Sequence, residues 1–170
     1  MRWLETRVPP PLAMLLCAAI GYMGSRWQPG GALQLPMPEL LAGLVMVFGV
    51  VLNLLPKLAF RRVGTTVNPL RPAASSVLVT HGVYRYTRNP MYLGQATVLA
   101  GAMLYLQNLA ALLAVPLFVL YINRWQIVPE ERALSARLPE AYAAFRQRVR
   151  HWLQRGSGRY GAIWHFTAAE

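Results

Sequence analysis

The feature that most constrains this chain is its longest stretch without a charged residue. The stretch covers Asn89–Asn123, and as one helix it would be roughly 50 Å long. Because the hydrocarbon core of a bilayer is about 30 Å thick, a helix of this length is too long for a single crossing. Because the polar pair Gln107–Asn108 lies near the middle, we expect a tight helical hairpin. Its two arms are predicted at about 90–106 and 109–127.

Two further apolar runs come earlier in the chain, at about 8–25 and 39–60. Each is about long enough to cross a bilayer as a helix. Arg2 and Arg7 before the first run imitate a signal peptide. Because prolines open this run and no clear cleavage sequence follows it, we expect a retained span. The sequence therefore predicts an all-α integral membrane protein with about four transmembrane helices, forming one membrane domain over 1–170.

The composition agrees with a surface that faces lipid. Of the 170 residues, 55% are hydrophobic and 14% are charged, whereas soluble domains carry about 25% charged residues. The net charge of +11 would also suit nucleic acid, but the basic residues lie between and beside the apolar runs. Membrane lipids are therefore an expected partner and nucleic acid is not. The single cysteine, Cys17, excludes a disulfide framework, and no metal site is expected.

The distribution of basic residues predicts the orientation. Six of them lie between Lys57 and Arg88, in the loop that separates the second and third spans, and the C-terminal tail is strongly basic. The loop after the first span carries only Arg26. The positive-inside rule then places both termini and the middle loop on the cytoplasmic side of the inner membrane. The middle loop and the tail therefore share one side.

The tail is predicted to form an amphipathic helix over about 129–154. Its apolar residues recur at spacings of three and four, namely Leu134, Leu138, Tyr142, Phe145, Val149 and Trp152. Pro139 predicts a break, with one helix stopping near Leu138 and the next beginning at the proline. The simplest interpretation of the apolar side is a surface anchor on anionic lipid.

The middle loop is the first candidate for chemistry. His81, Tyr84 and Arg88 come directly before a helix that Asn89 would cap and Pro90 would begin. The free amides of a helix N-terminus beside an arginine attract an anion. A simpler interpretation is an ordinary cytoplasmic border, with arginines that set the topology and tyrosines of the aromatic belt.

The second candidate is the pair Glu130-Glu131, which follows the fourth predicted span. Two adjacent carboxylates at a membrane border are costly unless they are solvated or paired. A simple explanation is that they lie in the first turn of a helix and compensate its macrodipole. The functional interpretation requires them to face Arg85 or Arg88, or a cationic ligand.

Several motifs resemble the isoprenylcysteine carboxyl methyltransferase and phospholipid methyltransferase superfamily. The matching pieces are Gly64-Thr65-Thr66-Val67-Asn68-Pro69, the run Leu78–Gly94, the pair Glu130-Glu131, and the tail Tyr142…Phe145…Arg148-Val149. Together they cover roughly the last two thirds of the chain. Where the eukaryotic carboxyl methyltransferases have Arg-His-Pro, this chain has Arg88-Asn89-Pro90. That difference bears on the acceptor more than on the cofactor.

The resemblance implies methyl transfer from S-adenosylmethionine to a lipophilic small-molecule, lipid or lipidated acceptor, with carboxyl methylation of the isoprenylcysteine type favoured. It implies a cofactor loop at 64–94 and a larger set of cofactor-binding residues: Leu78, Val79, His81, Gly82, Tyr84, Arg88, Asn89, Pro90, Tyr92, Leu93, Glu130 and Glu131. Of these, Arg88, Glu130 and Glu131 would be catalytic, while Tyr142 and Arg148 would meet the substrate. Tyr92 and Trp125 would shield the sulfonium by cation–π contact.

Other functions stay open from the sequence. The acceptor chemistry also includes a phospholipid amine and a thiol. A membrane reductase that uses NADPH is an alternative enzyme, and a scaffold that holds anionic lipid on its basic face is the alternative without catalysis. The sequence contains no G-x-G-x-x-G motif and no aspartate to hold a ribose, so a soluble dinucleotide-type pocket is not expected.

Overall fold

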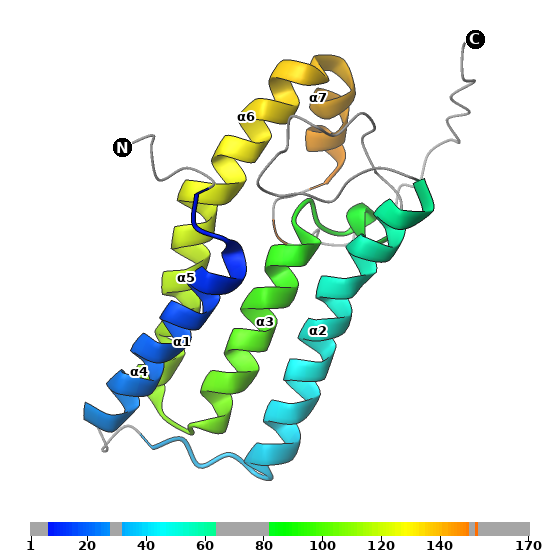
Figure 1. Ribbon diagram of the computed structural model, residues 1–170. Coiled ribbons are helices and arrows are strands. Elements are labelled where there is room, and N and C mark those ends of the chain that lie inside the picture. Colours follow the sequence, from blue (N-terminus) through cyan, green and yellow to red (C-terminus); the bar gives the residue numbers. More distant parts are fainter. Residues whose placement is uncertain (1–6, 28–31, 64–81, 150–151, 153–170) are drawn as a thin grey trace.

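The computed structural model describes residues 7–27, 32–63, 82–149 and 152. Within these residues the protein is helical, and the only extended pairing is a bridge between Ala32 and Asn108. The helices are α1 (Pro10–Trp27), α2 (Pro38–Val63), the 3-10 turn η3 (Gly82–Arg85), α3 (Pro90–Tyr105), α4 (Leu109–Leu112), α5 (Ala114–Ile122), the π-helical turn η4 (Asn123–Ile127), α6 (Val128–Arg137) and α7 (Pro139–Arg148). In Figure 1, α3 lies between α2 on one side and α1 with α5 on the other. The predicted all-α class is confirmed.

The helical segment that begins at Leu109, the fourth predicted span, extends further than predicted. It runs from Leu109 to Arg137 with one turn residue, Leu113, between α4 and α5, and Ile127 and Val128 both have helical backbone angles. The tail is helical from near Pro129 as predicted, since α6 begins at Val128, but α6 follows directly on the π-helical turn instead of starting after a break. A proline ring inside an α-helix clashes with the carbonyl four residues earlier, and the wider π-helical turn directly before Pro129 relieves that clash.

The end of this helix agrees with the sequence. The helix stops at Arg137, and α7 begins at Pro139. The break that Pro139 predicts is therefore confirmed. The second tail helix ends at Arg148 instead of near residue 154, and Val149 has extended backbone angles.

In the part of the chain that the structure describes, two helices are long and apolar enough to cross a membrane, Pro38–Leu58 and Leu109–Arg137. Only 11% of the most apolar part of the first is buried inside the protein, and it exposes large side chains such as Leu44, Val47 and Phe48. The core helix of a soluble protein would be mostly buried, so an exposed apolar helix of this length indicates contact with lipid. Crossing of the membrane by α1 and α3, and hence the count of four spans, stays a prediction.

Helices α2 and α3 approach so closely that their backbones touch. A Cβ atom added to Gly94 would lie 2.6 Å from the backbone nitrogen of Asn53, and one added to Gly101 would lie 2.9 Å from that of Met46. Glycines at these two positions leave room for such close packing of two helices. The side chain of Asn53 also donates a hydrogen bond to the carbonyl of Met91 at 3.0 Å. This contact fixes the first turn of α3, and the sequence analysis missed it.

Cysteine labelling tests the predicted orientation. In a Cys17→Ser background, we expect Tyr86→Cys to react with a membrane-impermeant maleimide in inverted vesicles and Trp27→Cys to react in right-side-out vesicles. Both side chains are well exposed, at 56% and 87% of their surface, and the positive-inside rule places them on opposite sides. If both positions react in one of the two preparations and neither reacts in the other, they lie on the same side of the membrane and the predicted orientation is wrong.

Candidate functional site

A short turn leads into α3 and holds the backbone around Arg88. It begins at Gly82, whose φ of +64° glycine adopts without steric cost. Thr87 is almost fully buried, and its hydroxyl accepts a hydrogen bond from the backbone nitrogen of Asn89 at 3.1 Å. Pro90 begins α3 as predicted, but the side chain of Asn89 makes no capping hydrogen bond, so that prediction is wrong.

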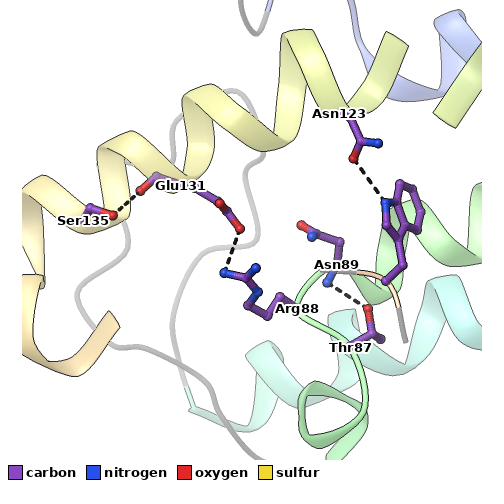
Figure 2. Close-up of polar contacts among 7 residues, drawn as sticks. Thr87, Arg88, Asn89, Asn123, Glu131 and Ser135 are labelled. Carbon is purple, nitrogen blue, oxygen red and sulfur yellow. Dashed lines mark hydrogen bonds and ion pairs between the residues drawn. The ribbon is translucent and has the colours of Figure 1, made fainter. Parts of the chain in front are cut away.

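Arg88 reaches from this turn across to α6. Its Nη1 lies 3.0 Å from Oε1 of Glu131, and the two side chains are only 7% and 14% exposed. Figure 2 shows the guanidinium pointing at the carboxylate. Within the described part of the chain, Nε of Arg88 has no hydrogen-bond partner, and Nη1 is close to Glu131 without being aligned for a hydrogen bond. The buried guanidinium therefore keeps N–H donors that none of the described residues satisfies.

Glu131 has further contacts along the tail. The hydroxyl of Tyr142 on α7 donates a hydrogen bond to its carboxylate. Burial raises the pKa of Tyr142, and the negative charge of Glu131 raises it further. The phenol therefore stays protonated at neutral pH and acts as a donor. The structure thus places Tyr142, a predicted substrate residue, against the carboxylate that pairs with Arg88.

Glu130 has its own partners, separate from those of Glu131. The hydroxyl of Tyr92 on α3 donates a hydrogen bond to Oε1 of Glu130. Tyr84 interacts electrostatically with the same carboxylate. Burial raises the pKa of its phenol, and the negative charge of Glu130 raises this pKa further. Each glutamate is therefore held by a different tyrosine.

Helix capping alone does not explain the two glutamates. They lie inside the helical segment Leu109–Arg137, and an interior position has few free N-terminal amides for a carboxylate to compensate. Both glutamates do lie in the first turn of α6, as that interpretation expects, but α6 continues from η4 and offers them few free amides. What the two positions have in common is that both face the turn before α3 and the first turns of that helix.

The apolar side of the tail packs against the protein. Tyr142, Phe145 and Val149 form one buried cluster with Tyr84. These residues are covered, so the interpretation of this side as a lipid anchor is wrong for them. Arg148 lies exposed at the end of α7, and its predicted contact with substrate stays a prediction.

The remaining predicted site residues have no described contact with Arg88, Glu130 or Glu131. Trp125 stacks on Tyr121, with ring centroids 5.0 Å apart. Leu93 is half-buried in α3, where its carbonyl accepts a hydrogen bond from the hydroxyl of Thr97. Three predicted cofactor-binding residues, Leu78, Val79 and His81, lie outside the described residues.

The π-helical turn contributes two contacts that the sequence analysis missed. Oδ1 of Asn123 accepts a hydrogen bond from the indole of Trp152 at 3.2 Å, which brings the chain beyond α7 back to the bundle. The fully buried Gln126 donates from Nε2 to the carbonyl of Val8 at 2.7 Å, across to the start of α1. The available signal was two amide side chains within an otherwise apolar helix, since buried polar groups need partners.

Comparison with known proteins agrees with the resemblance seen in the motifs. The phospholipid methyltransferase family matches residues 38–140, which is more than half of the chain and includes Arg88, Glu130 and Glu131. A protein from Haemophilus influenzae, described as an uncharacterized protein, is 40% identical over 63 residues, which is 37% of this chain and the whole of that protein. No solved structure matches. The chain belongs to the phospholipid methyltransferase family, a family of membrane methyltransferases.

Proposed function

We propose that the protein transfers a methyl group from S-adenosylmethionine to a lipophilic acceptor at the membrane border. The observation that carries this proposal is the buried contact of 3.0 Å between Arg88 and Glu131. It joins the loop motif before α3 to the glutamate pair after the fourth predicted span. Both motifs lie within the residues that match the methyltransferase family.

The donors and acceptors of the site suit this cofactor. S-adenosylmethionine carries a sulfonium, an ammonium and a carboxylate. Glu131 supplies negative charge for the cationic groups, and the carboxyl oxygens of Glu130 add hydrogen-bond acceptors for the ammonium. The N–H groups of Arg88 that no described residue satisfies supply donors for a carboxylate, which a planar guanidinium recognises well. The phenols of Tyr84 and Tyr142 stay neutral because their pKa values are raised, so they add donors without adding charge.

The protein's contribution is mainly to bind and to orient. S-adenosylmethionine supplies an already activated methyl group on its sulfonium. In our proposal, Arg88 and the two glutamates hold the charged end of the cofactor, while Tyr92 fixes the carboxylate of Glu130. The aromatic cluster of Tyr84, Tyr142 and Phe145 excludes water from the site. Orientation of reactants can lower a barrier by roughly 7–11 kcal/mol.

We propose a carboxylate as the first acceptor to examine. A carboxylate is nucleophilic without a general base, whereas an amine acceptor must lose a proton. The described groups around Arg88 are two carboxylates already engaged by hydrogen-bond donors, and tyrosines that keep their protons. Such a set suits an acceptor that needs only alignment and desolvation.

A labelling experiment tests the proposed function. Protein purified in detergent is incubated with native lipid extract and S-adenosylmethionine that carries a radiolabelled methyl group. We expect labelled lipid-soluble product, and we expect mild alkali to release the label as volatile methanol, because methyl esters hydrolyse whereas N-methyl and S-methyl groups do not.

Binding measurements distinguish the competing functions. The proposal predicts saturable binding of S-adenosylmethionine and no binding of NADPH. Binding of NADPH alone would favour a reductase, and binding of neither would favour a lipid scaffold, whose affinity falls steeply with salt. Alkali-stable product with saturable S-adenosylmethionine binding would keep the methyltransferase and reject the carboxylate acceptor.

A further inference from the structure

A second polar site lies at the other end of the bundle. A pocket of about 460 Å³ is formed between the last turns of α1, the segment 32–34 and the turn 106–108 that joins α3 to α4. Figure 1 shows this end of α1, α3 and α4 opposite the end that carries α6 and α7. The pocket is therefore separate from the Arg88–Glu131 site.

The walls of this pocket are tied together by backbone contacts. The backbone nitrogen of Leu33 donates to the carbonyl of Gln107 at 2.7 Å, and Ala32 pairs with Asn108 as an isolated antiparallel bridge. Gln107 has a φ of +48°, a conformation that is uncommon for a residue with a side chain and that persists where its surroundings impose it. The pocket is thus built from a defined turn.

The pocket contains one formal charge, that of Arg26. Among the described residues, Arg26 forms no ion pair. The remaining polar groups that line the pocket include the amides of Gln34 and Gln107 and the hydroxyl of Tyr22. One guanidinium surrounded by neutral donors is suited to a phosphate ester.

The surroundings favour a lipid as the source of that phosphate. On the same end of α1, Tyr22, Met23 and Trp27 are exposed at 52%, 64% and 87%. Tyrosine and tryptophan are enriched where a membrane protein passes through the headgroup region. A pocket volume of a few hundred Å³ is also in the range of small-molecule sites. We propose that the pocket binds the phosphate headgroup of an anionic phospholipid in the leaflet at that end of the bundle.

Native mass spectrometry of the full-length protein tests this site with phosphatidylglycerol in detergent. We expect one retained lipid on the wild type and about tenfold weaker binding in Arg26→Gln. Arg137→Gln removes an exposed arginine from the other end of the protein and should leave this binding unchanged. Ser25→Trp narrows the pocket while keeping Arg26, and it should also weaken binding.

Equal affinity of the wild type and Arg26→Gln for phosphatidylglycerol would overturn the proposal, as would an equal loss in Arg137→Gln. Phosphatidylcholine, which is zwitterionic, should bind more weakly than phosphatidylglycerol at this site. Glycerol 3-phosphate tests the source of the phosphate: if it binds to the wild type as tightly as the lipid does, a soluble phosphate ester is the ligand and the lipid assignment is wrong.

Discussion

Replacing Arg88 by methionine is expected to remove saturable binding of S-adenosylmethionine and to destabilise the protein. The change leaves the carboxylate of Glu131, which is 14% exposed, without the guanidinium 3.0 Å away. Removing one partner of a buried ion pair costs about 3–5 kcal/mol of stability. Loss of a buried charged contact to a ligand costs about 2–5 kcal/mol of binding free energy, so affinity should fall at least about thirtyfold. Isothermal titration and thermal unfolding in detergent measure the two effects.

A double variant distinguishes a binding role of Arg88 from a structural one. Arg88→Met combined with Glu131→Gln removes both charges, so no unpaired charge stays buried and most of the lost stability should return. Binding of S-adenosylmethionine should not return. Recovery of both properties in the double variant would mean that Arg88 acts only by neutralising Glu131. Arg85→Met, at an exposed arginine of the preceding turn, is the matched control and should change neither property.

Adding one methyl group at Gly94 is expected to have the largest effect of any small substitution outside the site. The new Cβ atom would lie 2.6 Å from the backbone nitrogen of Asn53 and 2.7 Å from the carbonyl oxygen of Gly49. Because backbone atoms cannot move aside as a side chain can, α2 and α3 must separate. Overpacking of this kind costs about 1–3 kcal/mol. It should also disturb the hydrogen bond from Asn53 to Met91 that fixes the start of α3.

Gly43 provides the matched control on α2. A Cβ atom there meets nothing within 4 Å, so Gly43→Ala should be neutral or stabilising by about 0.5–1 kcal/mol, since alanine loses less conformational freedom in a helix than glycine. Thermal unfolding of both variants in the same detergent measures the contrast. Equal stability of Gly94→Ala and Gly43→Ala would show that the helices are not in backbone contact.

The parts of this fold that the sequence predicts are those that depend on neighbouring residues or on how the basic residues are distributed along the chain. Pro90 and Pro139 begin helices where the sequence predicts because a proline belongs in the first turn of a helix. The motif positions also predicted that Arg88 and Glu131 belong together, since topology places them on one side of the membrane. Their separation of 3.0 Å required the structure.

The unpredicted parts depend on contacts between distant segments. An apolar stripe on a tail helix has the same sequence pattern whether it contacts lipid or protein. The contact with protein became visible only when the structure placed Tyr84, from the turn before α3, against this stripe. The same applies to Asn53 and Gln126, whose amides find backbone carbonyls on other helices. The continuity of the helix across Pro129 depends on a π-helical turn that propensities do not predict.

That turn also determines which way everything after it faces. In an α-helix each residue advances the side-chain direction by about 100°, and a π-helical turn contains one residue more than an α-helical turn. If Asn123–Ile127 wound as an ordinary α-helix instead, its surplus residue would swing the carboxylates of Glu130 and Glu131 about a quarter of the way around the axis. The glutamates face Arg88 and Tyr92 because the π-helical turn accommodates a surplus residue without that rotation.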